Sequence, residues 1–222
     1  MKLRDDFQKL IYVVIDPFVK GLIHIGLTPN MVTFIGFLLN VCAAYLFVVA
    51  NPVISDTYAY NYSMIMYAGI VLFIGSMFDM LDGQVARIGN MKTTFGAMFD
   101  SILDRYSEMI TLLAISYLFF SSDSMLWGLV TFLAMLGSLM VSYVRARAEG
   151  LGLECKVGFL QRPERVVITF VAAFLSGLLE CIEILQWAMA FIAVFANITA
   201  FWRIIYCKRQ IEKNNSDIVS EQ

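Results

Sequence analysis

Six long apolar stretches dominate the sequence and constrain its fold more than any other feature. With short polar breaks between them, they run over residues 29–50, 62–88, 94–121, 124–149, 163–181 and 184–208. About 20 helical residues cross the ~30 Å hydrocarbon core of a bilayer, so each stretch is long enough to span it. Helices pair their own backbone groups within lipid, and the alternation that marks a membrane β-barrel is not seen in the sequence. We therefore expect an all-α integral membrane protein with six transmembrane helices.

The overall composition agrees with residence in a membrane. Hydrophobic residues make up 59% of the chain and charged residues 15%. Soluble domains carry nearer a quarter charged residues, so the composition excludes disorder, fibrous repeats and most soluble folds. The four cysteines show no short pairing pattern, which gives no support to a disulfide framework or a zinc site.

The basic residues indicate which side of the membrane each end faces. All sixteen Lys and Arg fall within residues 2–20, 87–105, 145–165 and 203–213. The remaining turns, which hold none, are near residues 51–61, 121–124 and 180–184. Basic residues are enriched on the cytoplasmic side of membrane proteins, so we expect both termini and two loops there. The expected location is the cell membrane, crossed several times.

Three segments divide the chain. Residues 1–27 are expected to form a juxtamembrane amphipathic helix at the interface, because apolar residues there lie beside basic ones. The segment holds acids and no small-residue cleavage site, so a cleavable signal peptide is not indicated. Residues 28–209 form the six-helix domain, which begins with Thr28 as helix cap and Pro29 at the first helical position. Residues 210–222 are expected to be a disordered cytoplasmic tail.

Four aspartates stand within or at the ends of the apolar stretches, where a carboxylate is costly and usually functional. Asp79 and Asp82 are three residues apart, so they share one face of a helix. Asp100 and Asp104 are four residues apart and share one face of the next helix. A hairpin through residues 88–95 would bring the two faces together.

The four aspartates indicate a divalent-metal site. Carboxylates in one pocket repel one another unless cations lie between them. Oxygen ligands suit Mg²⁺ or Mn²⁺, and four acids can hold two ions about 3.5–4 Å apart, the geometry of in-line phosphoryl transfer. Gly83, Ala86 and Gly96 leave room near the backbone on the same faces, and the Arg87 guanidinium suits phosphate. The pattern favours metal-assisted phosphoryl chemistry.

Two other interpretations of the aspartates stay open at this point. In the first interpretation, basic residues neutralise the acids within the helix bundle, although only Arg87 and Arg105 are near in sequence. In the second interpretation, the acids form a proton or cation pathway, as in transporters. A cation transporter gives no reason for the spacing of the glycines, the alanine and the arginine between the acids.

The complete spacing resembles the signature of a known family. The CDP-alcohol phosphotransferase family has a motif similar to Asp79-x2-Asp82-Gly83-x2-Ala86-Arg87-x8-Gly96-x3-Asp100-x3-Asp104, and every position of it is occupied. Six helices with both ends inside also resemble this family. The resemblance implies transfer of a phosphoalcohol or phosphatidyl group from a CDP-linked donor to an acceptor hydroxyl, with release of CMP.

The resemblance also implies roles for individual residues. Two Mg²⁺ or Mn²⁺ ions per active site would be held by Asp79, Asp82, Asp100 and Asp104. Asp104 would also act as general base on the acceptor hydroxyl. The donor's cytidine diphosphate would be contacted by Thr28, Pro29, Asn30, Met31, Gly83, Arg87 and Thr93. For Thr28 and Pro29, helix capping explains the residue types equally well.

Two basic segments indicate the acceptor. Residues 142–149 and 158–165 are similar to the phosphatidylinositol phosphate synthases, the branch that uses inositol 1-phosphate, and to their archaeal ether-lipid counterparts. An acceptor phosphate carries about −1.5 to −2 charges at neutral pH and is bound well by arginine. The candidates for binding it are Ser142, Arg145, Arg147 and Arg203. Residues 145 and 147 cannot both point into one pocket from a regular helix, and interfacial anchoring is an alternative role for these arginines.

These features predict an enzyme of phospholipid biosynthesis. It would transfer the phosphatidyl group of CDP-diacylglycerol to inositol 1-phosphate, giving phosphatidylinositol phosphate and CMP. Glycerol 3-phosphate, giving phosphatidylglycerophosphate, stays open as the acceptor, and so does a neutral alcohol such as inositol, which the arginines disfavour. Gln161 departs from the family pattern, in which an acid is usual. The expected partners are these substrates, membrane lipids and a second copy in a homodimer, but no nucleic acid, and the active site is expected on the cytoplasmic side.

Overall fold

The computed structural model describes residues 17–52 and 59–220, with side chains described as far as residue 213. All regular secondary structure in these residues is helical, beginning with a short helix over residues 17–24. The long helices are α2 (Pro29–Val49), α3 (Tyr62–Ile88), α4 (Thr94–Phe120), α5 (Met125–Gly150), α6 (Arg162–Leu178) and α7 (Glu183–Ser220). The predicted all-α fold is confirmed, and each apolar stretch coincides with one of these six helices.

Four of the described helical segments are long and apolar enough to cross a membrane. They are α2, α3, α5 and residues Glu183–Lys213 of α7. The first half of α4 carries several charged side chains, and α6 has only 17 residues. The helices therefore support a multi-pass membrane protein, while the count of six spans stays a prediction.

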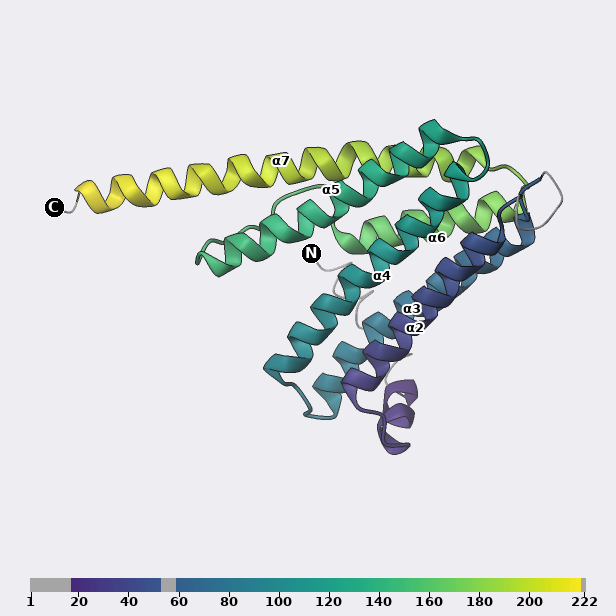
Figure 1. Ribbon diagram of the computed structural model, residues 1–222. Helices are drawn as coiled ribbons and strands as arrows, with labels where there is room; N and C mark the ends of the chain where they lie inside the picture. The colour runs from purple at the N-terminus through teal and green to yellow at the C-terminus, as the bar shows by residue number, and fades with distance from the viewer. Residues whose placement is uncertain (1–16, 53–58, 221–222) are drawn as a thin grey trace, which may run out of the picture.

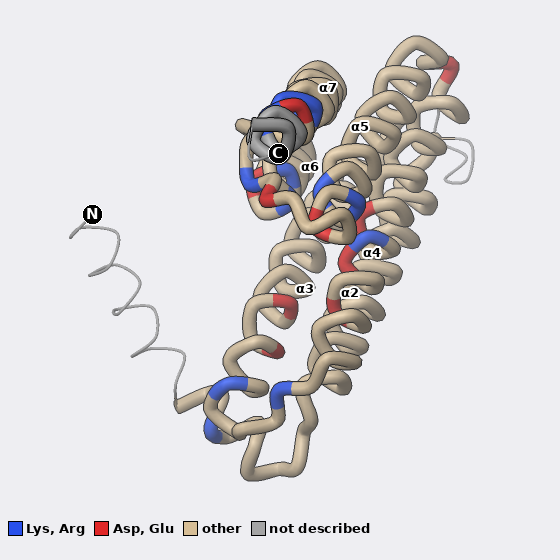
Figure 2. Tube along the Cα trace, turned by 90° about the vertical axis from the view of Figure 1, so that its left-hand side faces the viewer, with Lys and Arg blue, Asp and Glu red and all other residues tan. Residues whose placement is uncertain are grey.

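The helices form two arms that meet at an angle (Figure 1). α2 packs on α3 and α4 in one arm, and α5 packs along α7 in the other. α4 also contacts α5, and α6 lies against both α3 and α7, so α4 and α6 connect the arms. The buried core includes Phe47, Leu72, Leu118, Phe119 and Met189. Figure 2 shows acidic residues of α3 within the first arm and basic residues gathered at the turns at its lower end.

Small residues let α2 and α3 approach closely. A Cβ added at Gly36 of α2 would come within 3.3 Å of the Phe78 Cβ and 3.6 Å of the Asp79 backbone nitrogen. A Cβ added at Gly75 of α3 would come within 2.9 Å of the Asn40 amide nitrogen. Glycine at both positions therefore sets the spacing of these helices next to the first aspartate.

The predicted N-terminal segment is described only in part. The sequence predicts an interfacial helix over residues 1–27, of which residues 1–16 lie outside the described residues. Within residues 17–24, Val19 and Leu22 are buried and pack in one apolar cluster with Leu81 of α3. The described part is therefore fixed against the lower end of α3.

The C-terminal segment differs from the prediction. The sequence predicts a disordered tail over residues 210–222, but α7 continues as a helix to Ser220. The Gln210 amide donates a hydrogen bond to the Glu154 carbonyl at 3.2 Å. Extending an existing helix fixes one residue for each hydrogen bond gained, so a polar segment can continue a helix that it would not nucleate.

Candidate active site

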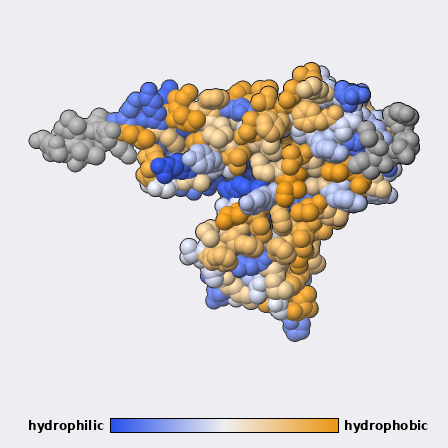
Figure 3. Space-filling model, viewed as in Figure 1, coloured by the Kyte–Doolittle hydropathy of each residue, from blue (hydrophilic) through white to orange (hydrophobic). Residues whose placement is uncertain are grey.

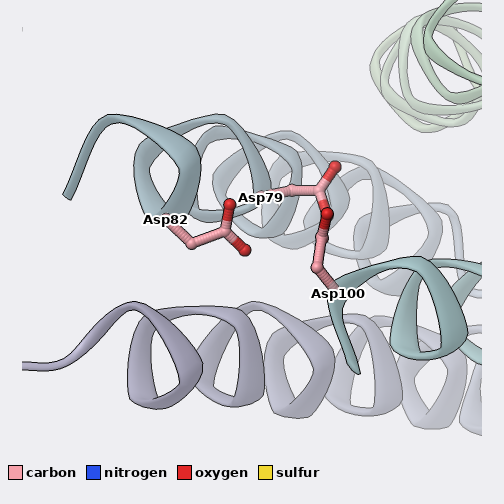
Figure 4. Close-up of side chains that lie close together, drawn as sticks. All are labelled: Asp79, Asp82 and Asp100. Carbon is pink, nitrogen blue, oxygen red and sulfur yellow. The ribbon is translucent and has the colours of Figure 1, made fainter. Parts of the chain in front are cut away.

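Three carboxylates meet between α3 and α4. Asp79 and Asp82 project from α3 and Asp100 from the start of α4, and their carboxylates lie close together (Figure 4). One oxygen from each lies within 4.8 Å of the other two. Thr93 caps α4 by accepting a hydrogen bond from the Gly96 amide at 2.9 Å, directly after the turn that reverses the chain. The predicted hairpin thus brings the two acidic faces together.

Asp104 is joined to this group through an arginine from a distant part of the sequence. The Arg162 Nη1 lies 2.6 Å from Asp104 Oδ2 and 2.7 Å from Asp79 Oδ2. The three side chains are 19%, 14% and 30% exposed, respectively. Among the described residues, Arg162 Nε and Asp104 Oδ1 are buried without a hydrogen-bond partner. A basic residue does neutralise part of the cluster, but it comes from the start of α6 rather than from the neighbouring Arg87 or Arg105.

A second acid–arginine pair lies one helical turn further along both helices. Arg165 Nε and Nη2 contact Glu108 Oε1 and Oε2 at 2.6 and 2.9 Å, and Arg165 Nη1 donates to the Leu160 carbonyl at 2.9 Å. The two charged side chains are 1% and 6% exposed. The sequence prediction missed Glu108, although it follows Asp104 by four residues and therefore continues the acidic face of α4. The pair connects α4 to α6.

Asp82 has a hydrogen-bond partner that sequence reasoning also missed. Thr33 of α2 donates to Asp82 Oδ2 at 2.6 Å, and both residues are 5% exposed. No local signal predicts this contact, because the two residues are 49 positions apart in the sequence. The bond ties one acid of α3 to α2.

A groove of about 260 Å³ opens beside the carboxylates. It is lined by Pro29, Asn30, Thr33, Asp82, Gly83, Ala86, Met91, Lys92, Thr93, Gly96, Ala97 and Asp100. A Cβ added at Gly83 would meet nothing within 4 Å, so bare backbone faces the groove there. A Cβ added at Gly96 would come within 2.9 Å of Thr93 Oγ1 and 3.1 Å of Asn30 Oδ1. The groove therefore offers backbone and small polar groups next to the acids.

The predicted donor contacts are only partly gathered in this groove. Pro29, Asn30, Gly83 and Thr93 line it. Thr28 caps α2 through a 3.4 Å contact from the Met31 amide, and Met31 lies in a separate apolar hollow with Phe95 and Phe99. Arg87 donates to Gln84 Oε1 at 2.7 Å on the exposed side of α3, outside the groove lining.

The predicted acceptor residues are only partly brought together in the structure. Arg203 is 2% exposed and donates to the carbonyls of Val157 and Val141 at 2.7 and 2.6 Å. Arg145 pairs with Glu149 at 2.9 Å on the partly exposed end of α5. Arg145 and Arg165 are both close enough to Arg203 to repel it electrostatically. Three guanidinium groups therefore share this region, and Arg165 was not predicted to belong to it.

Arg147 faces a different surface. It lines a groove between α5 and α7, together with residues such as Tyr143 and Cys207. This agrees with the expectation that residues 145 and 147 point in different directions. Ser142, one turn before Arg145, is half-buried on α5.

The acidic cluster fits a hard divalent cation. Its donors are carboxylate oxygens from two helices, close enough to share one ion. Such an all-oxygen set suits Mg²⁺ or Mn²⁺ better than softer metals. The buried Asp104 Oδ1 without a hydrogen-bond partner adds a further oxygen at the edge of the cluster.

Comparison with known proteins identifies the class of enzyme. Residues 26–202 match the CDP-alcohol phosphatidyltransferase family, so the chain belongs to that family, as its motif predicted. The match spans every helix of the first arm and most of the second. The expected metal-dependent phosphatidyltransferase class is thereby confirmed.

Individual relatives narrow the comparison. The chain is 37% identical over 210 residues to archaetidylinositol phosphate synthase of Methanothermobacter thermautotrophicus, covering 94% of this chain and 95% of the relative. It is 34% identical over 194 residues to the enzyme of the same name from Pyrococcus horikoshii, covering 87% and 90%.

Solved structures show the same fold. The crystal structure of Mycobacterium tuberculosis phosphatidylinositol phosphate synthase with CDP-DAG bound matches with a TM-score of 0.75 at 30% identity, covering 86% of this chain and 92% of that one. A structure of that enzyme in complex with manganese and citrate matches with a TM-score of 0.76.

Proposed function

We propose that this chain transfers the phosphatidyl group of CDP-diacylglycerol, or its ether-lipid equivalent, to inositol 1-phosphate. The products are phosphatidylinositol phosphate and CMP. The observation that carries the proposal is the meeting of Asp79, Asp82 and Asp100 beside the groove that contains Asn30 and Gly83. Similarity to enzymes named for inositol phosphate lipids, over most of their length, supports the choice of acceptor.

The donor would lie with its nucleotide in the groove. Bare backbone at Gly83 leaves room for a diphosphate to approach α3, and Asn30 and Thr93 offer polar groups to the cytidine. Mg²⁺ or Mn²⁺, as two ions held by Asp79, Asp82, Asp100 and Asp104, would offset the charge that develops on the departing CMP. The first arm would hold the acyl chains on the bilayer side.

Asp104 is suited to remove the proton of the acceptor hydroxyl. Its Oδ2 contacts Arg162, which holds the carboxylate in place, while its buried Oδ1 has no hydrogen-bond partner among the described residues. The acceptor oxygen bonds to the phosphorus that carries diacylglycerol, the bond from that phosphorus to CMP breaks, and the hydroxyl proton passes to Asp104. Positioning supplies the remaining rate enhancement.

The acceptor phosphate would bind at Ser142, Arg145 and Arg203. Arg203 is held in place by two backbone carbonyls, and the neighbouring, partly exposed Arg145 adds positive charge. Arg147 lines another surface and is left out of this site. Two guanidinium groups in one region favour a phosphorylated acceptor over a neutral alcohol.

The membrane arrangement completes the proposal. All six helices α2 to α7 would span the bilayer, with both termini and the active site on the cytoplasmic side. Residues 1–27 would form an interfacial segment before the catalytic domain, and two chains would associate as a homodimer. Basic turns at the lower end of the first arm support this orientation (Figure 2).

One assay tests the reaction directly. Purified protein with labelled CDP-diacylglycerol and Mg²⁺ or Mn²⁺ is offered inositol 1-phosphate, glycerol 3-phosphate or inositol in parallel. We expect CMP release and a phosphatidylinositol phosphate product with the first acceptor, and loss of both in an Asp82→Asn variant. A phosphatidylglycerophosphate product would reassign the acceptor, and cation flux in liposomes without CMP release would favour a transporter.

A further inference from the structure

A second groove, of about 560 Å³, lies between α5 and α7 near the C-terminal end of α5. Its apolar walls include Met140, Val144, Ala148, Leu151, Ile204 and Ile211. Its charged lining residues are Arg147 of α5 and Lys208 and Glu212 of α7. The groove therefore combines a long apolar surface with two cations and one acid, a net positive charge, and none of its lining belongs to the groove beside the aspartates.

Both cations stand where the apolar parts of the helices end. α5 ends at Gly150, and α7 becomes polar after Cys207. Lys208 lies 3.6 Å from Glu212, but these side chains are 73% and 62% exposed, so water screens the pair. Arg147 is exposed. Figure 3 shows hydrophilic residues toward this end of α7, beyond a hydrophobic surface, which is the pattern expected at the depth of lipid phosphates.

We propose that this groove binds an anionic phospholipid. One acyl chain would lie along α5 and α7, and the lipid phosphate would lie between Arg147 and Lys208. A soluble anion would leave the apolar walls uncovered, whereas a lipid covers them and pairs with both cations. A zwitterionic lipid brings its own cation to the two basic side chains. Charge complementarity therefore selects an anionic head group.

Lipid binding can be measured on the intact protein. The detergent-purified full chain is titrated with phosphatidylglycerol or phosphatidylcholine, and bound lipids are counted by native mass spectrometry. The test variant is Arg147→Gln/Lys208→Gln. The control, Lys156→Gln/Arg209→Gln, removes the same charge from exposed residues outside the groove lining. We expect the wild-type chain and the control to prefer phosphatidylglycerol, and the test variant to bind it roughly 25-fold more weakly, about fivefold for each cation.

Three outcomes would overturn the proposal. The first is equal binding of both lipids by the wild-type chain. The second is a control variant that loses as much affinity as the test variant. The third outcome is a dimer that dissociates in the test variant, which would assign the groove to a second copy of the chain. Because both changed side chains are exposed, loss of folding is not expected to obscure the comparison.

A second inference concerns Thr33 and rests on a separate observation. Its hydroxyl lies 2.6 Å from Asp82 Oδ2 and 3.0 Å from the Pro29 carbonyl. The hydroxyl has one proton, and the shorter contact to a charged acceptor takes it. This fixes the orientation of the Asp82 carboxylate, one oxygen of which lies within 4.8 Å of oxygens of Asp79 and Asp100. We infer that Thr33 is a positioning residue for the divalent metal.

The metal itself provides the test. Thr33→Val removes the hydroxyl with little change of shape, and Thr33→Ser keeps it. Mn²⁺ binding is measured by electron paramagnetic resonance without donor or acceptor. We expect Thr33→Val to bind Mn²⁺ about 10–100-fold more weakly and Thr33→Ser to stay close to wild type, as for other residues that orient metal ligands.

Failure of this inference is distinguishable from failure of the proposed function, on which it rests. A wild-type chain that does not bind Mn²⁺ would contradict the proposed metal site. Wild-type binding that Thr33→Val leaves unchanged, or that Thr33→Ser weakens as much, would contradict only the role of Thr33. The melting temperature without metal shows whether either variant has lost the fold.

Discussion

Two arginine–carboxylate arrangements lie one helical turn apart along α4 and α6, and they differ in how completely the arginine is paired. Arg165 uses all three of its side-chain nitrogens, two on Glu108 and one on a backbone carbonyl. Arg162 brings a single nitrogen to both Asp79 and Asp104, and its Nε has no partner among the described residues. Both arrangements join an arginine of α6 to a carboxylate of α4, but only Arg165 has a partner for every side-chain nitrogen.

This difference indicates that the Arg165–Glu108 pair is structural and that the Arg162 group is part of the reactive site. A buried ion pair is tolerated when every polar atom is satisfied, and the Glu108 pair meets that condition. The Arg162 group is more exposed and leaves oxygens available, so a cation or a substrate can replace part of its contacts. We therefore expect changes at the first pair to affect folding and changes at the second to affect catalysis.

The largest expected effect is on catalysis, in Asp104→Asn. The amide keeps the shape of the side chain but cannot accept the acceptor proton, so we expect turnover to fall by roughly 10²–10⁴-fold. Thermal unfolding should change little, because Arg162 keeps its contact with Asp79. CMP release and a melting curve measure the two effects. Turnover close to wild type would refute the role of Asp104 as base.

Next in size is the loss of stability in Glu108→Gln. It leaves the Arg165 charge buried without a counter-charge, which costs about 3–5 kcal/mol. Thermal unfolding in detergent measures the loss. The matched control is Glu108→Leu/Arg165→Met, which removes both charges and should recover most of the stability. If Glu108→Gln were as stable as the wild-type chain, the Arg165–Glu108 pair would not be a structural contact of this kind.

A smaller effect is expected for Arg162→Gln, and it should respond to metal. Removing the arginine leaves the aspartates to repel one another, with an expected loss of about 1–3 kcal/mol. Added Mn²⁺ replaces the missing positive charge, so it should stabilise this variant more than wild type. Melting curves with and without Mn²⁺ test this. Equal rescue of Glu108→Gln by the metal would erase the distinction between the pairs.

The smallest expected effect is on the reactivity of a cysteine in the loop over residues 151–161, whose Leu160 carbonyl accepts a hydrogen bond from Arg165. Cys155 is buried in this loop, and burial raises the pKa of its thiol to about 11. The neutral thiol is therefore stabilised by folding, a contribution that is complete below pH 9 and is lost as the pH rises toward 11. At pH 8 we expect slow alkylation of Cys155, severalfold faster in Glu108→Gln but not in Arg162→Gln.

The partly exposed Cys181, in the turn between α6 and α7, supplies the internal control for this measurement. Its alkylation rate should be the same in all three proteins, because it lies away from the loop before α6. If Cys155 reacts as fast as Cys181 in the wild-type chain, the loop is not held in the way the Arg165 contacts indicate.

Much of the fold follows from the sequence because each apolar stretch fixes one helix. The predicted stretches agree with α2 to α6 within a few residues, and the spacing of the aspartates places each pair on one helical face. These are local properties, which the period of the helix determines. The family motif extends this local information to the residues proposed to hold the metal.

The parts that were missed depend on how helices meet. Arg162 is 83 residues from Asp79, and Thr33 is 49 residues from Asp82, so neither contact is visible in local spacing. Arg203 was expected to hold a phosphate, and its contacts with two backbone carbonyls depend on the path of the loop before α6. Helix period gives the face of a side chain but not the rotation of one helix against another.

The close contact of α2 with α3 at Gly36 has a consequence for the choice of ion. Because a Cβ at Gly36 would come within 3.3 Å of the Phe78 Cβ and 3.4 Å of the Gly75 carbonyl, there is little room for these helices to move closer together. Asp82 is held from α2, so the same contact limits how far the carboxylates can move apart. We therefore expect the site to bind a small cation such as Mg²⁺ or Mn²⁺ more tightly than Ca²⁺, whose larger ionic radius would require a wider ring of oxygens.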